Sequence, residues 1–230
     1  IYTLTNPDVM SPSFAPTGWS VRTLLDTIAN ANPPYHALID TGALITGMSN
    51  LQVAQYLLKH GLAQMEGVVF LDEWDRKMIL VRATGRVLKL AECGIPKVKR
   101  FAFYDQVHTT GMDIQHTPNA MAIQTLGKDM VFRDFAQGAY RMRGIGQGQR
   151  IHLYVIPEVA GRISHVLGAK HSTGRPEVDV PAWLLLNAMR IEGLQSVKLA
   201  AQEVANVFRK RCLSALLDEV ARFEIIVTDS

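Results

Sequence analysis

Two segments of the chain combine residue types that enzymes use to handle phosphate groups. One spans residues 108–114 and directly follows an apolar stretch, and the other spans residues 137–147 and ends in a glycine-rich sequence. The residues of interest are Thr110, Gly111 and Asp113 in the first segment and Gln137, Arg141 and Arg143 in the second. An arginine fixed against a transferred phosphoryl group stabilises the negative charge on its oxygens, because its planar guanidinium stays charged and can bind two oxygens at once.

A helix is expected from about Phe132 to Met142, and it places polar residues of the second segment together. Gln137 and Arg141 are one helical turn apart, so both side chains can point into the same cleft. The glycines that follow allow the backbone to approach a phosphate or a facing domain closely. We therefore predict Arg141 and Arg143 as catalytic residues, and the other four residues as the lining of a nucleotide or nucleic-acid cleft. No metal site is predicted.

The order of these segments resembles the two late motifs of superfamily 2 helicases. Those motifs are a Thr…Gly-x-Asp-Ile loop and a Gln-x-x-x-Arg helix that ends in Ile-Gly-Gln, closest in form to the chromatin-remodelling branch. The resemblance implies a second RecA-like lobe over residues 36–160. One position departs from the family pattern, because Gly144 stands where the second arginine is expected and Arg143 comes one place early. Either Arg143 takes that role or Arg141 acts alone.

The chain lacks the phosphate-binding loop that a complete nucleotide engine needs. Its Gly127-Lys128 pair is followed by Asp129, and Ala122 stands where the first glycine of that loop belongs. The resemblance therefore implies that ATP and Mg²⁺ bind only when a first RecA-like lobe elsewhere in the parent chain completes the cleft. The fragment alone is expected to bind neither. A third hypothesis is a degenerate lobe that binds no nucleotide and serves only in protein–protein contacts.

Two acidic motifs suggest other chemistry. Asp72-Glu73-Trp74-Asp75 imitates a magnesium-binding motif, but the apolar stretch that follows favours a turn in a charged hairpin. Asp40-Thr41-Gly42 matches the catalytic loop of dimeric aspartic proteases, in which two carboxylates share a proton. The helix expected after Ser49 does not suit an all-β protease, and the alternative interpretation is a strand that ends in a turn.

Several segments together resemble a family of very large, poorly characterised eukaryotic proteins that are commonly catalogued as ubiquitinyl hydrolases. The similar segments are residues 37–43, 69–73, 103–114 and 125–144. This resemblance implies a thiol deubiquitinase in which the present region is scaffold or binding surface, with ubiquitin as a possible partner beside nucleic acid. Neither Cys93 nor Cys212 has the Asp-x-x-Cys context of that chemistry, so no catalytic cysteine is predicted.

The composition is that of an ordinary globular protein. The chain has 230 residues, 48% hydrophobic and 20% charged, and a formal net charge of +3, which is too weak to argue for nucleic acid by itself. No apolar run is long enough to cross a membrane, so no membrane partner is expected. The two cysteines suit a reducing compartment, and we expect an intracellular protein, cytoplasmic or nuclear. Because Ile1 comes first, the chain is expected to be a fragment of a longer polypeptide.

Short apolar stretches alternate with helical patterns, which predicts an α/β fold with a mostly parallel sheet in three layers. In such sheets ligands bind at the carboxyl ends of the strands, so the candidate loops follow Ile39, Leu71, Tyr104 and Leu126. The expected organisation is a linker with a short helix over 1–35, the lobe over 36–160, a connection over 161–180 and a helical appendage over 181–230.

Overall fold

The computed structural model describes residues 2–109 and 112–228, with side chains described as far as residue 220. The strands are β1 (Met10–Phe14), β2 (Ala37–Ile39), β3 (Gly67–Leu71), β4 (Lys77–Val81), β5 (Val87–Lys89), β6 (Arg100–Tyr104), β7 (Met121–Thr125) and β8 (Arg150–Val155). The α-helices are α1 (Val21–Ala29), α2 (Asn50–His60), α3 (Phe132–Ala139), α4 (Pro157–His171) and α5 (Pro176–Thr228). The predicted α/β class is confirmed.

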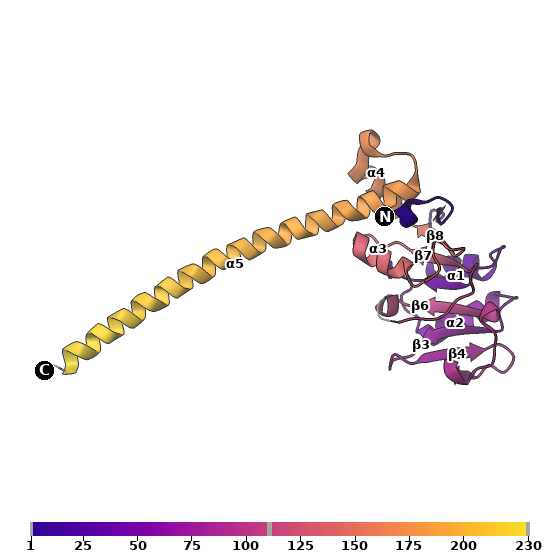
Figure 1. The fold of residues 1–230 in the computed structure, drawn as a ribbon, viewed down its shortest axis with the longest axis horizontal. Coiled ribbons are helices and arrows are strands. Elements are labelled where there is room, and N and C mark those ends of the chain that lie inside the picture. Colours follow the sequence, from indigo (N-terminus) through magenta and orange to yellow (C-terminus); the bar gives the residue numbers. More distant parts are fainter. Residues whose placement is uncertain (1, 110–111, 229–230) are drawn as a thin grey trace. The chain divides into compact units, whose positions relative to one another are not determined.

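All these strands belong to one mixed sheet in the order β1-β8-β7-β2-β6-β3-β4-β5 (Figure 1). The neighbours from β1 to β3 pair in parallel, whereas β3-β4 and β4-β5 are antiparallel. Central β2 is fully buried, with Leu38 opposite Phe103 on one side and Ile123 on the other. A continuous apolar strand of this kind fits a parallel sheet that is covered on both faces. The predicted mostly parallel sheet is therefore confirmed, and it is consistent with a RecA-like architecture.

Local sequence signals fix where the first helices begin. Ser20 caps α1 and exchanges hydrogen bonds with Thr23, and Ser49 caps α2 and exchanges them with Gln52. These capping boxes satisfy backbone N–H groups that have no partner inside the helix. The apolar faces of α1 and α2 then pack against each other and against the sheet.

The direction of the crossovers places helices on both faces of the sheet. The chain moves along the sheet in one direction from β2 through α2 to β3, and in the other direction from β7 through α3 to β8. Because such crossovers are right-handed, α2 and α3 cover opposite faces. The three layers follow from this reversal.

The segment expected as a linker with a short helix contains that helix, α1, and also contributes an edge strand. β1 pairs in parallel with β8, and Met10 is opposite Ile151 and fully buried. Pro12 lies within β1, opposite Leu153. Proline is tolerated on an edge strand, where one side of the backbone has no strand to pair with. Pro12 is therefore compatible with a strand at the edge of the sheet.

The segment expected as a connection is mainly helical. α4 occupies Pro157–His171, and α5 already begins at Pro176. Proline is favoured in the first turn of a helix, so these two prolines begin helices where they had suggested breaks. The first compact unit comprises residues 1–187, and the second, residues 188–230, belongs to α5 as far as Thr228. A long C-terminal helix is thus confirmed; it begins before the expected residue 181, whereas the second unit begins after it, at residue 188.

Candidate functional site

The candidate site lies where the order of strands in the sheet reverses. β2 and β7 are neighbours, but the connections that leave their carboxyl ends run toward opposite edges of the sheet. In open α/β sheets this arrangement leaves a crevice between the two loops, and ligands bind there. Two of the candidate loops, after Ile39 and Leu126, meet at this point.

Close backbone contact between these two loops depends on glycine. A Cβ atom placed on Gly42 would lie 2.6 Å from the backbone nitrogen of Gly127, and one on Gly127 would lie 2.6 Å from the carbonyl oxygen of Gly42. A Cβ atom on Gly138 of α3 would lie 2.6 Å from Nε2 of Gln124. Glycines at these positions therefore bring the two loops and α3 together more closely than any other residue allows.

A buried carboxylate holds the first loop in place. Asp40 is 2% exposed, and its Oδ1 accepts hydrogen bonds from the backbone nitrogen of Leu44 at 3.0 Å and from the Thr125 hydroxyl at 2.6 Å. Its Oδ2 accepts one from the backbone nitrogen of Ile45 at 2.9 Å. Burial raises the pKa of Asp40, although these hydrogen bonds act in the opposite direction.

These contacts give Asp40 a structural role that differs from protease chemistry. A protease dyad needs two carboxylates that face each other and a water molecule, whereas both oxygens of Asp40 are occupied within one α/β subunit. The alternative interpretation of this motif, a strand that ends in a turn, agrees with the structure.

A cavity of about 450 Å³, here called the carboxyl-edge cavity, opens beside these loops. It is lined by Thr41, Gly42, Ala43, Gln106, Thr109, Gly127, Lys128, Asp129, Met130, Asp134 and Gln137. Three strand ends and α3 contribute to it, and its size is within the range of small-molecule sites. Among the described side chains, the Lys128 ammonium has no hydrogen-bond or ion-pair partner, so it is available to an anionic ligand.

The wall of the cavity is held by a buried amide. Gln124 of β7 is fully buried, and its Nε2 donates to the Thr41 hydroxyl at 2.9 Å and to the carbonyl of Phe135 at 3.0 Å. These bonds tie β2, β7 and α3 together directly behind the cavity. The Oε1 atom of Gln124 has no hydrogen-bond partner among the described residues.

The two arginines predicted as catalytic lie in different surroundings. Arg141 is 8% exposed, and its guanidinium donates to the backbone carbonyl of Met112 and, at 3.4 Å, to that of Gln137. Arg143 is exposed and forms an ion pair with Asp113 at 3.2 Å. Arg141 thus positions the segment around residue 112, while only Arg143 presents its charge to solvent.

The predicted site residues do not converge on one cleft. Gln137 lines the carboxyl-edge cavity, whereas Asp113 and Arg143 line a separate pocket of about 420 Å³. That pocket includes Lys97 and Gln149, which precede β6 and β8, so it extends toward the amino ends of these strands. Thr110 and Gly111 lie outside the described residues.

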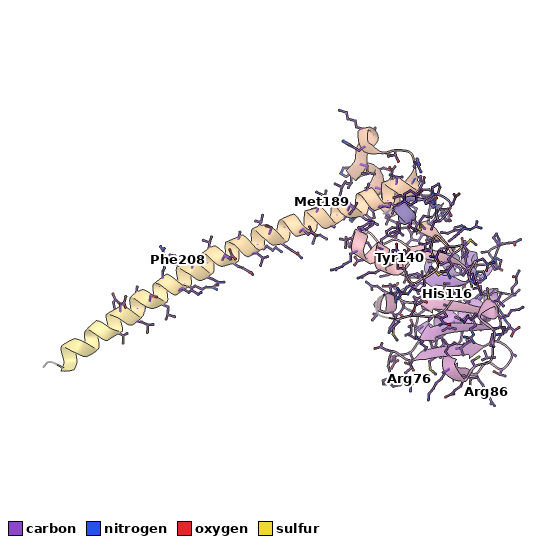
Figure 2. All side chains as sticks on the ribbon, viewed as in Figure 1. Arg76, Arg86, His116, Tyr140, Met189 and Phe208 are labelled. Atoms are coloured by element: carbon purple, nitrogen blue, oxygen red, sulfur yellow. The ribbon has the colours of Figure 1, made fainter. Side chains whose placement is uncertain are left out.

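A histidine in the second pocket is held in its neutral form. Nε2 of His116, labelled in Figure 2, lies 3.0 Å from the hydroxyl of Tyr104. Burial, with a smaller contribution from nearby His36, lowers the pKa of His116 from 6.5 to about 4. Between about pH 4 and pH 6.5, His116 is therefore mostly neutral in the folded protein and mostly protonated in the unfolded chain.

This difference predicts a loss of stability in mild acid. The unfolded chain takes up a proton on His116 below pH 6.5, but the folded chain does so only near pH 4. Between pH 7 and pH 5 the free energy of unfolding should therefore fall by about 2 kcal/mol through this group. Urea unfolding at both pH values should show a smaller fall in His116→Asn. The same substitution at exposed His60 should keep the wild-type difference, and an equal fall in both variants would contradict the assignment.

Two other motifs have structural explanations in this fold. Asp72 closes the turn between β3 and β4, where it accepts hydrogen bonds from the backbone of Trp74 and from Arg76, so the predicted charged hairpin is confirmed. Cys93 is partly exposed in a loop, Cys212 is exposed on α5, and neither thiol bonds to a histidine among the described residues.

Several residues of the carboxyl-edge cavity were missed as functional candidates. Gly42 was considered only as part of a protease-like motif, and Lys128 only as part of an incomplete phosphate-binding loop. Asp134 was not singled out. The signal that could have found them is the pair of loops after Ile39 and Leu126, because each follows a buried parallel strand. Which loops are neighbours depends on the order of strands, and local sequence patterns do not contain that order.

Together these features define an α/β protein with a ligand-sized cavity at the switch point of a mostly parallel sheet. Comparison of the chain with protein-family models, curated proteins and solved structures finds no match. Within the described residues, no helix combines the length and apolar character needed to span a membrane.

Proposed function

We propose that this chain is the second RecA-like lobe of an NTP-dependent hydrolase and that its carboxyl-edge cavity contributes contacts to the nucleotide phosphates. The observation that carries the proposal is the position of this cavity at the reversal of strand order. Thr109 and Gln137, which line it, come from the two segments that the sequence analysis singled out. The nucleotide-binding site would be completed by a first lobe elsewhere in a longer polypeptide.

The chemistry of the cavity suits phosphate groups better than it suits the metal. Lys128 supplies a positive charge without a partner in the part of the chain that the structure describes, and Gln137 supplies an amide donor. The two carboxylates that also line the cavity are those of Asp129 and Asp134, and they lie 3.7 and 3.8 Å from the guanidinium groups of Arg162 and Arg133. The described residues contain no group of three or more side chains able to hold a metal ion. The proposal therefore assigns the Mg²⁺ that accompanies ATP to the partner lobe.

The geometry also assigns different roles to Arg141 and Arg143. Arg141 is a positioning residue, because its guanidinium bonds to the Met112 carbonyl and is nearly buried. Arg143 lies in the other pocket, paired with Asp113, and we assign it no phosphate contact.

ATP hydrolysis by the longer polypeptide that carries this lobe together with a first lobe tests the proposal. Lys128→Ala and Gln137→Ala should each lower kcat/KM at least about tenfold, because each removes a contact to charge that develops in the transition state. Lys77→Ala, an exposed change on β4 outside the lining of the cavity, should leave kcat/KM unchanged. Urea unfolding of each variant checks that the fold is intact.

Arg143→Ala distinguishes the two pockets in the same assay. If Arg143→Ala abolishes turnover while Lys128→Ala and Gln137→Ala do not, the phosphates bind at the second pocket and the assignment to the carboxyl-edge cavity is wrong. If such a polypeptide hydrolyses no nucleoside triphosphate, the proposed function is wrong as a whole.

A further inference from the structure

A third hollow, here called the hairpin groove, lies at the carboxyl ends of β3 and β6 and shares no lining residue with the carboxyl-edge cavity. It has a volume of about 580 Å³ and lies between the start of α2 and the β3-β4 hairpin. Its apolar side chains are Leu51, Phe70, Leu71, Met78 and Val87, and its polar rim includes Asp72, Glu73, Trp74, Asp105 and His108. The groove is too large for a single ion, and its volume is within the range of ligand sites.

The rim carries a net negative charge. Four carboxylates, those of Asp72, Glu73, Asp75 and Asp105, gather around two cationic groups, Arg76 and His108. His108 bonds to Asp105 through Nδ1 and to Asp75 through Nε2, the second contact at 2.7 Å. Even with both cationic groups charged, four negative charges and two positive charges leave a net charge of −2.

Some of these carboxylate oxygens have no hydrogen-bond or ion-pair partner among the described residues and are available to bind a ligand. Asp72 is used within the hairpin, where it binds Arg76 at 2.7 Å. By contrast, the Glu73 carboxylate has no hydrogen bond or ion pair among the described residues, and of Asp105 only Oδ1 is used. An unpaired carboxylate beside apolar surface favours a ligand with positive charge next to apolar groups.

The rim already contains one cationic side chain that lies on an aromatic ring, that of Arg76. The Arg76 guanidinium lies 4.6 Å from the centre of the Trp74 ring, and Trp74 is 69% exposed. Figure 2 shows Arg76 at the end of the hairpin opposite Arg86. The face of an aromatic ring attracts positive charge, and here the contact is made by an arginine of the same hairpin.

We propose that this groove binds a basic, partly apolar segment of a partner protein, with a lysine or arginine side chain at Glu73 and Asp105 and an apolar side chain on Met78 and Val87. The whole chain has a formal net charge of +3. General attraction therefore does not draw a basic segment to this protein, and binding depends on the local field of the groove.

A peptide of ten alternating lysines and leucines is the probe, and the same peptide with glutamates in place of lysines is its control. Calorimetry on the 230-residue chain should give a Kd on the order of 10–100 µM for the basic peptide, which falls off with added salt. Glu73→Lys and Trp74→Ala should each weaken binding at least fivefold. Tryptophan fluorescence supplies a second readout: Trp74 is exposed at the rim, so the basic peptide should change the emission of the wild type but not that of Trp74→Ala.

Glu66→Lys is the matched control variant. Glu66 directly precedes β3 and is exposed, whereas Glu73 follows the same strand, so both variants change the net charge equally. Glu66→Lys should bind the basic peptide like the wild type. The proposal is overturned if the wild type does not bind the basic peptide, if the acidic peptide binds equally well, or if Glu73→Lys and Glu66→Lys have the same effect.

Discussion

Replacement of Gly127 by alanine should lower the free energy of unfolding by about 2–4 kcal/mol. The added Cβ atom would lie 2.6 Å from the carbonyl oxygen of Gly42, and this neighbour is backbone, which cannot rotate away as a side chain can. The loops after β2 and β7 must then separate, which also disturbs the carboxyl-edge cavity. Urea denaturation followed by circular dichroism measures the effect.

The control for this prediction is Gly161→Ala. Gly161 lies within α4, and a Cβ atom there meets nothing within 4 Å. Alanine is the better helix former, so this variant should gain up to about 1 kcal/mol. If Gly127→Ala is as stable as the wild type, the two loops are not in backbone contact and the description of the switch point is wrong.

Asp40→Ala should lower the free energy of unfolding by about 3–5 kcal/mol, because it leaves two backbone N–H groups and a hydroxyl without their acceptor. The three donors, Leu44, Ile45 and Thr125, lie 2.6–3.0 Å from the carboxylate oxygens, and Asp40 is 2% exposed. Water therefore cannot replace the lost acceptor easily. The midpoint of urea unfolding at pH 7 reports the loss.

Two further variants separate hydrogen bonding from charge. Asp40→Asn keeps one carbonyl acceptor and should lose less stability than Asp40→Ala. Asp129→Ala removes a carboxylate from the lining of the carboxyl-edge cavity, but its ion pair with Arg162 is long, at 3.7 Å, and its side chain is 79% exposed. That change should cost less than about 0.5 kcal/mol. Equal losses for Asp40→Ala and Asp129→Ala would show that Asp40 has no special structural role.

Local patterns in the sequence predicted most of the regular elements. The capping residues Ser20 and Ser49 and the short apolar runs near Ile39 and Tyr104 act through near neighbours in the chain, so a sequence window contains the cause. The regions 1–35 and 161–180 hold an edge strand and helical turns that the sequence did not predict, and the meaning of Pro12 and Pro176 there depends on context. A proline breaks a structure in the interior of an element, but it is compatible with an edge strand or with the first turn of a helix.

The candidate site was predicted only in part, for a similar reason. The sequence by itself determined which loops follow buried strands, and it singled out Gln137 and the segment that includes Thr109. Only the tertiary structure decided that β2 lies next to β7, that Gly42 contacts Gly127, and that Arg143 lies in a different pocket from Gln137. The order of strands depends on long-range packing and on the direction of each crossover, and that packing decides which side chains share a cavity.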